Sequence, residues 1–262
     1  MITGFGNMGK TYANSFISSR FIKPEDIHVL VRDVTKIEFD TIPSSNFLST
    51  PTAKIGDFDI IILAVKPQDF NHLAKTIQPF IKENQLVLSV MAGVTIATIQ
   101  NELKCQKVVR SMPNIPTQIG LGMTVFTASA AVDRKELFII QNLINTTGKS
   151  VYVEEEKLLN AATAISGSGP AYVFYFMNAM IKAAVELGFN ESEAELLVNQ
   201  TFMGSVAIQN SSSLSNEEWI AKVASKGGTT ESALKVFNQK MVTEAIVEAI
   251  HSANTRAVEL GS

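Results

Sequence analysis

The first residues of the chain contain three glycines whose spacing suits phosphate binding. Gly4, Gly6 and Gly9 form the pattern G-x-G-x-x-G. In a strand-turn-helix unit this pattern provides a tight turn, a close approach of the backbone to a pyrophosphate, and close packing of helix on strand. The pyrophosphate then binds free N–H groups at the helix N-terminus. Plain flexible loops contain the same spacing, so the flanking residues must decide between the two interpretations. The candidate cofactor-binding residues here are Gly4, Phe5, Gly6, Asn7 and Met8.

The flanking residues predict a strand, a helix and a second strand. Residues 12–17 can form a helix with Ala13 and Phe16 on one side, and residues 27–31 are an apolar run rich in β-branched residues. Together they span about 30 residues, the length that a dinucleotide-binding unit requires. Only three residues precede Gly4, so the first strand is either very short or begins upstream. This context favours a bound dinucleotide.

The end of the second predicted strand distinguishes between nicotinamide cofactors. At this position an acidic residue binds the ribose 2′-hydroxyl of NAD, whereas an arginine accommodates the 2′-phosphate of NADP. Arg32 and Asp33 stand there side by side. A planar guanidinium can stack and still bind phosphate with two hydrogen bonds, so Arg32 favours NADP(H), while Asp33 leaves NAD(H) possible. The alternative is a solvated salt bridge between these two side chains.

Further candidates follow other predicted strands, at residues 60–65, 86–91 and 108–111. The run at 60–65 is continuously apolar, which is typical of a central strand buried on both faces. In a doubly wound fold the ligand binds at the carboxyl ends of such strands. Simple turn formation is the alternative explanation for each segment. The candidates at these ends are Ala64, Val65, Lys66 and Pro67, then Met91, Ala92 and Gly93, and then residues 112–114.

The pattern changes from strands to helices after residue 153. Two more strands are predicted at 123–126 and 150–153, and beyond them apolar residues recur at spacings of three and four. The predicted class is α/β. Residues 1–153 would form a Rossmann-like, doubly wound, mainly parallel sheet, and residues 154–262 an all-helical domain.

The helical half carries its own local signals. Ser215 with Glu218 forms a capping box, and Asn190 with Glu193 is a similar helix start. Residues 174–180 are rich in Phe, Tyr and Met. They belong either to an ordinary core or to an interface between subunits.

Two clusters of small and hydroxyl residues lie in this half. Residues 166–172 read Ser-Gly-Ser-Gly-Pro-Ala-Tyr and separate two helices, with Pro170 suited to the first turn of the second. Residues 223–231 form a glycine-bearing loop before a helix that Thr229 or Thr230 would cap. Such loops can bind a small anion, but a helix dipole contributes only about 0.3 to 2 kcal/mol, so several charge-assisted hydrogen bonds must share the task. Helix capping alone explains the glycines about as well.

The composition argues against several classes of protein. With 46% hydrophobic residues, 18% charged residues and a formal net charge of −3, the chain can build a core but offers no excess positive charge to nucleic acid or anionic lipid. Cys105 is the only cysteine, which fits a reducing compartment and an inert core thiol. The three histidines lack metal-ligand spacing, so no metal is expected. Without a predicted signal peptide or spanning helix, the protein is expected to be soluble and cytoplasmic.

Taken together, these motifs resemble those of the pyrroline-5-carboxylate reductases, which complete proline biosynthesis. The resemblance covers nearly the whole chain, and its most specific blocks are residues 166–172 and the Gly-Gly-Thr-Thr of residues 227–230. It implies reduction of 1-pyrroline-5-carboxylate to L-proline by NAD(P)H bound in the N-terminal domain. It also implies that the helical domain pairs two subunits, that the site lies where the dimer halves meet, and that dimers can assemble into rings.

The resemblance assigns roles to individual residues. Thr230, the catalytic candidate, would direct its hydroxyl at the ring nitrogen of the cyclic imine, while Gly228 and Thr229 would donate backbone N–H groups to its carboxylate. Ser225 belongs to the same substrate loop, and Glu156 would lie near the substrate. A protonated imine is already electrophilic, so holding it against the cofactor supplies much of the catalysis, and no general base is assigned.

Two departures from the family pattern, Lys226 and Asp33, leave other functions open. Lys226 stands where the family usually has proline, so Lys226→Pro should preserve folding and change the apparent affinity for the imine or the cofactor. A regulatory or scaffold paralogue that binds nucleotide without turnover would fit Lys226 and Asp33, but would have no need of Thr229 and Thr230. A 3-hydroxy acid dehydrogenase would need a catalytic lysine, and Lys182 lies in the wrong place, after the Ser-Gly-Ser-Gly-Pro block. The ring size of the imine is left open.

Overall fold

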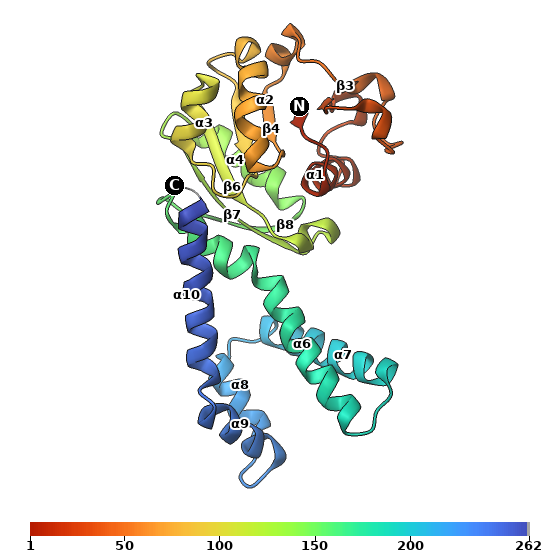
Figure 1. The fold of residues 1–262 in the computed structure, drawn as a ribbon, viewed down its shortest axis with the longest axis vertical. Coiled ribbons are helices and arrows are strands. Elements are labelled where there is room, and N and C mark those ends of the chain that lie inside the picture. Colours follow the sequence, from red (N-terminus) through yellow and green to blue (C-terminus); the bar gives the residue numbers. More distant parts are fainter. Residues whose placement is uncertain (261–262) are drawn as a thin grey trace. The chain divides into compact units, whose positions relative to one another are not determined.

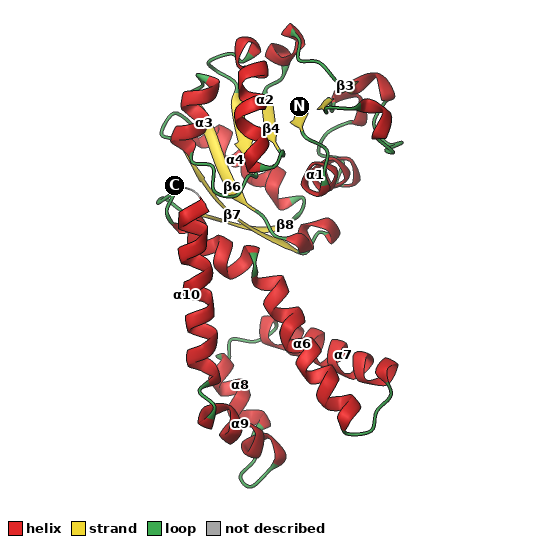
Figure 2. Cartoon of the chain, in the orientation of Figure 1, coloured by secondary structure: helices red, strands yellow, loops and turns green. Residues whose placement is uncertain are grey.

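The structure, a computed structural model, describes residues 1–260 and forms two compact units. One comprises Met1–Ser168 with the residues from Ala253 onward, and the other comprises Gly169–Ser252. All strands of the described chain lie in the first unit, and the second is helical (Figures 1 and 2). The change from strands to helices follows the last strand, Gly148–Tyr152, whereas the division between the units falls after Ser168.

The first unit is built on one twisted sheet with the order β3-β2-β1-β4-β5-β6-β7-β8. Every neighbouring pair is parallel except β6 and β7. This order, which runs outward from β1 in both directions, confirms the doubly wound, mainly parallel sheet. The strands are β1 (Ile2–Thr3), β2 (Val29–Leu30), β3 (Phe47–Leu48), β4 (Ile60–Leu63), β5 (Leu86–Ser89), β6 (Lys107–Met112), β7 (Gly122–Ala128) and β8 (Gly148–Tyr152).

Two features of this sheet were not predicted. The edge strand β3 is too short to give the sequence an alternating pattern. Strand β7 runs antiparallel to β6 because only a short 3₁₀ segment, Ile115–Ile119, joins them. A parallel arrangement would have required a longer crossover, usually a helix.

Helices cover both faces of the sheet and complete its core (Figure 1). Helices α1 (Asn7–Ser18) and α4 (Arg134–Asn145) share one apolar cluster with Ile62 of β4. Helices α2 (Phe70–Ile77) and α3 (Ile96–Leu103) share a second cluster with Ile61 and Leu63. Successive residues of β4 therefore point to opposite buried faces, which confirms its assignment as a central strand. Cys105 belongs to the second cluster and is 1% exposed, so it is the core thiol that was expected.

The second unit consists of helices α6 to α9 and the first part of α10. Their bounds are α6 (Gly169–Glu186), α7 (Glu191–Asn210), α8 (Asn216–Val223), α9 (Thr229–Gln239) and α10 (Val242–Leu260). Both predicted capping boxes form, at Asn190 and at Ser215. The expected threonine cap of α9 is wrong, because the N-cap is Gly228 in an extended conformation and Thr229 is already helical.

Apolar side chains of α6 remain exposed in the single chain. No residue of this helix is buried, and Phe174 and Tyr175 are 58% and 74% exposed. An ordinary core would have hidden them, so the core interpretation of residues 174–180 is wrong for one isolated chain. Within residues 1–260, no helix is both long and apolar enough to cross a membrane.

Candidate functional site

A cleft of about 520 Å³ opens in the first unit where the strand ends meet α1 and α2. Seven of the predicted cofactor residues line it, namely Gly4, Phe5, Gly6, Arg32, Ala64, Val65 and Lys66. The other six lie outside this lining, namely Asn7, Met8, Pro67, Met91, Ala92 and Gly93. Asp69, His72 and Thr76 also line the cleft. Sequence reasoning missed these three because they lie on or just before α2, beyond the strand end at which ligands were expected.

The glycine pattern has the geometry that a pyrophosphate site needs. Gly4 has a φ of +86°, and a Cβ there would lie 2.8 Å from the carbonyl oxygen of Ala64. A Cβ at Gly9 would lie 2.2 Å from the carbonyl oxygen of Gly4, so only glycine lets α1 pack so closely. A Cβ at Gly6 would meet nothing within 4 Å, which leaves room for a ligand. Gly6 is also the N-cap of α1 and no side chain caps that helix, so its first N–H groups suit an anion.

The two charged residues at the end of β2 do not pair with each other. Arg32 Nη2 lies 2.5 Å from Asp69 Oδ1, whereas Asp33 Oδ2 lies 3.2 Å from Lys36 Nζ. Asp33 Oδ1 also accepts hydrogen bonds from the backbone N–H and the hydroxyl of Thr35. These hydrogen bonds, with the nearby Lys36, lower the pKa of Asp33. The alternative interpretation of an Arg32–Asp33 salt bridge is therefore wrong.

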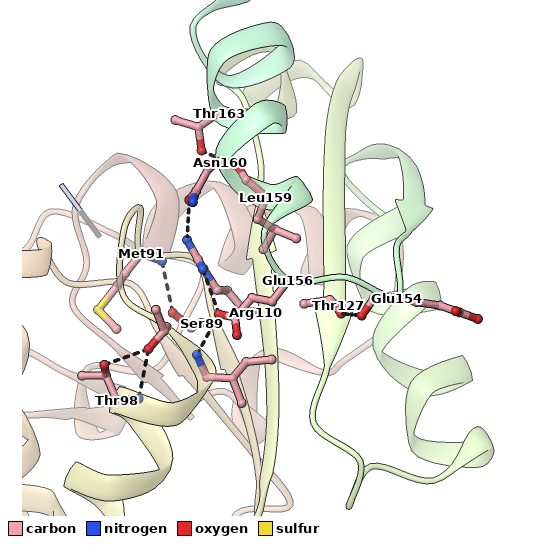
Figure 3. Close-up of polar contacts among 12 residues, drawn as sticks. Ser89, Met91, Thr98, Arg110, Thr127, Glu154, Glu156, Leu159, Asn160 and Thr163 are labelled. Atoms are coloured by element: carbon pink, nitrogen blue, oxygen red, sulfur yellow. Dashed lines mark hydrogen bonds and ion pairs between the residues drawn. The ribbon is translucent and has the colours of Figure 1, made fainter. Parts of the chain in front are cut away.

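Glu156, the acidic residue expected near the substrate, is part of a network at the ends of β5 and β6 (Figure 3). Its Oε1 accepts a hydrogen bond of 2.8 Å from Arg110 Nη1 and one of 2.9 Å from the backbone N–H of Ile96. Arg110 is only 4% exposed, and its Nη2 donates a hydrogen bond of 3.5 Å to Asn160 Oδ1. Glu156 therefore joins β6 to the first turn of α3, a contact between residues far apart in sequence.

The Ser-Gly-Ser-Gly-Pro-Ala-Tyr block at residues 166–172 begins in a widened helical turn. A π-helix, Thr163–Gly167, separates α5 (Leu158–Ala162) from α6, and Pro170 lies in the first turn of α6, as predicted. Asn114, after β6, donates to the carbonyl of Ser166 over 3.0 Å and accepts from the N–H of Met123 over 2.9 Å. The side chain after β6 thus ties this turn to β7.

The predicted substrate loop lies in the second unit and is held by its own hydrogen bonds. The N–H of Gly228 donates to the carbonyl of Ser225 over 2.9 Å, and the N–H of Gly227 donates to the carboxylate of Glu231. Gly227 has a φ of +74°. Thr229 and Thr230 begin α9, so their N–H groups have no acceptor within the helix. Of the two amides expected at the substrate carboxylate, that of Gly228 already has a partner.

Residues 1–260 contain no group of three or more His, Cys, Asp and Glu side chains arranged to hold a metal ion.

Comparison with known proteins agrees with this geometry. A family model described as "NADP oxidoreductase coenzyme F420-dependent" matches residues 1–93, and one described as "Pyrroline-5-carboxylate reductase dimerisation" matches residues 156–260. The sheet and cleft thus define an NAD(P)H-dependent oxidoreductase of the two-domain type.

Relatives and solved structures identify the family. Pyrroline-5-carboxylate reductase 2 of Bacillus subtilis is 35% identical over 98% of this chain and 93% of its own length, and the Aquifex aeolicus reductase is 33% identical over 99% and 96%. The Coxiella burnetii reductase structure has a TM-score of 0.90 at 31% identity, covering 100% of this chain and 97% of that one. The Plasmodium falciparum structure with NADP bound has a TM-score of 0.88 at 26% identity, with the same coverage. The chain belongs to the pyrroline-5-carboxylate reductase family.

Proposed function

We propose that this protein reduces 1-pyrroline-5-carboxylate to L-proline with NADPH, the last step of proline biosynthesis. The observation that carries the proposal is the Gly4-Gly6-Gly9 turn, where two glycines are sterically required and the third faces open space at the cleft. The full-length relatives bear the name of this activity, and the Plasmodium falciparum structure holds NADP. NADH remains a possible second cofactor.

In this proposal the first unit binds and orients the nucleotide. The N–H groups at the start of α1 receive the pyrophosphate, and Arg32 receives the 2′-phosphate. When bound, the nicotinamide supplies the hydride. The residues after β5, Met91 to Gly93, lie close in sequence to Ile96, whose N–H is held by Glu156. Glu156 acts as a positioning residue there, because its Oε1 already accepts hydrogen bonds from Arg110 and from the N–H of Ile96.

The substrate is held by the loop before α9. Thr229 donates its N–H to the substrate carboxylate, and the half-buried Thr230 directs its hydroxyl at the ring nitrogen. The N–H of Gly228 donates to the carbonyl of Ser225 and keeps the loop compact. A Cβ at Gly228 would lie 2.5 Å from Ser225 Oγ, so a larger residue there would disturb this turn. Orientation of a protonated imine can supply several kcal/mol of the barrier, so no general base is needed.

The protein forms a homo-oligomer, as its match to the dimerisation family indicates. We propose that its working unit is a dimer and that dimers can assemble into a larger ring. The exposed apolar residues of α6 and the match to a dimerisation family over residues 156–260 support this assembly. The cytoplasmic location expected from the sequence remains a prediction.

An absorbance assay at the NADPH band with the cyclic imine tests the activity. Thr230→Ala should lower kcat/KM by about 100-fold, the effect of losing one hydrogen-bond donor in a transition state. Thr230→Ser keeps the hydroxyl and should retain most of the activity, which makes it the matched control. NADPH binding without oxidation would instead favour the regulatory or scaffold paralogue, and full activity in Thr230→Ala would exclude the assigned role of that hydroxyl.

A further inference from the structure

An ion pair lies in the nucleotide cleft between residues from two different strand ends. Arg32 follows β2, and Asp69 ends the 3₁₀ turn Pro67–Asp69 that follows β4. Their closest atoms, Arg32 Nη2 and Asp69 Oδ1, are 2.5 Å apart, and both residues line the cleft. The arginine expected to read the 2′ group of the cofactor is therefore already paired with a carboxylate.

Asp33, the acidic residue that sequence position assigns to the ribose, also lines the cleft but has partners of its own. Its Oδ1 accepts hydrogen bonds of 3.0 Å from the Thr35 N–H and 2.6 Å from the Thr35 hydroxyl. Its Oδ2 pairs with Lys36. Asp33 lines the same cleft, but it caps the 3₁₀ turn Val34–Lys36 and its charge is already offset by Lys36 and by the hydrogen bonds from Thr35.

We infer that Asp69, and not Asp33, is the acidic residue that determines the choice between NADPH and NADH, and that it acts together with Arg32. A ribose 2′-hydroxyl can donate a hydrogen bond to the Asp69 carboxylate while the ion pair stays intact. A 2′-phosphate instead competes with Asp69 for the N–H donors of Arg32, and it lies near a second negative charge. This inference rests on the proposed function, because it requires the cleft to bind a nicotinamide dinucleotide.

The exposure of the pair makes such an exchange possible. The Arg32 side chain is 76% exposed and that of Asp69 is 31% exposed. Exposed ion pairs are weak, whereas an arginine that binds a phosphate with two charge-assisted hydrogen bonds is held more strongly. Lys66 also lines the cleft. Removing the Asp69 charge should therefore raise the affinity of the cleft for a 2′-phosphate, because Arg32 and Lys66 then have no competing carboxylate. It should lower the affinity for a 2′-hydroxyl, because the charged acceptor is lost.

Calorimetric binding of two cofactor fragments to the full-length protein tests the inference without any turnover. The fragments are adenosine 2′,5′-bisphosphate and AMP, which differ only in the 2′-phosphate. Asp69→Asn should bind the bisphosphate about two- to fivefold more tightly and AMP about two- to fivefold more weakly. Asp69 makes no side-chain cap to α2, so this variant keeps the hydrogen bonds of that helix.

Two control variants make the result specific. Asp57→Asn removes the same charge from an exposed residue that pairs with Lys82 over 3.8 Å and lies outside the cleft lining, so the ratio of the two affinities should not change. Asp33→Asn should also leave this ratio within about twofold. A shift of the ratio in Asp33→Asn but not in Asp69→Asn would overturn the inference, as would an unchanged ratio in Asp69→Asn.

Arg32→Gln provides a second test should Asp69→Asn fail to fold. It should weaken binding of the bisphosphate and leave binding of AMP within about twofold, because the Asp69 carboxylate that accepts from the 2′-hydroxyl stays in place. Equal weakening of both fragments would overturn the inference. Failure of the wild-type protein to bind either fragment would contradict the proposed function itself, which distinguishes that result from an unchanged ratio.

Discussion

The two units of this protein bury apolar residues to very different extents. In the first, successive residues of β4 point into separate clusters on opposite faces of the sheet, and Ile61 and Leu63 are fully buried. In the second, α6 has no buried residue, and α7 buries only Ala194 and Val198. A helix that exposes this much apolar surface needs another partner. The first unit therefore completes its core within one chain, whereas the second unit leaves apolar surface that the proposed dimer would cover.

A charge on α6 should have the largest effect on this contrast. Phe174→Asp should dissociate the oligomer, because a carboxylate buried without a partner in an apolar interface costs several kcal/mol. Light scattering after size-exclusion chromatography would measure the molar mass. Asn84→Asp, which adds the same charge at an exposed position of the first unit, is the control and should keep the wild-type mass. An unchanged mass in Phe174→Asp would mean that α6 does not form the interface.

Two alanine substitutions in the glycine turn separate packing from ligand binding within the first unit. In Gly9→Ala the new methyl would lie 2.2 Å from the carbonyl oxygen of Gly4, so we expect a loss of about 1–3 kcal/mol of unfolding free energy from overpacking. In Gly6→Ala the methyl meets no protein atom within 4 Å, so the melting temperature should hold while nucleotide affinity falls. Thermal unfolding and nucleotide titration of both variants measure this. Equal loss of stability in the two would contradict the assigned roles.

The smallest expected effect concerns the core of the first unit. Burial raises the pKa of the Cys105 thiol to about 11, from 9.0. A pKa raised by folding means that this thiol's contribution to stability is present below pH 9 and is lost as pH rises toward 11. Because the thiolate is the reactive form, alkylation of the native protein at pH 8 should be far slower than alkylation in denaturant. In Cys105→Ala the free energy of unfolding should depend less on pH between pH 9 and 11. Rapid alkylation of the native protein would contradict this and would show that the apolar cluster shared by α2 and α3 opens readily.

Much of the fold could be predicted because its signals are local. The capping boxes at Asn190 and Ser215 form as expected, since the residues that make them are three apart in sequence. The continuous apolar run of β4 indicated a strand buried on both faces. By contrast, β3 is too short to leave a pattern, and the threonine cap of α9 was wrong because the chain turns at Gly228 one residue earlier.

The candidate site could be predicted only in part, because its contacts join distant segments. Arg32 pairs with Asp69 and not with its neighbour Asp33, which Thr35 and Lys36 engage. Glu156 meets Arg110 and the N–H of Ile96 across 46 and 60 positions of sequence. Motif reasoning finds such residues as candidates but cannot say which partners they have.

Residues a few positions apart suffice to predict the glycine turn, the alternation of strands and helices in the first half and the helical character of the second. The direction of β7, the partner of Arg32 and the contacts of Glu156 follow from the folded chain alone. These depend on which strand ends the sheet brings together. An ion pair or hydrogen bond forms only between atoms that the whole fold places within a few ångströms of each other.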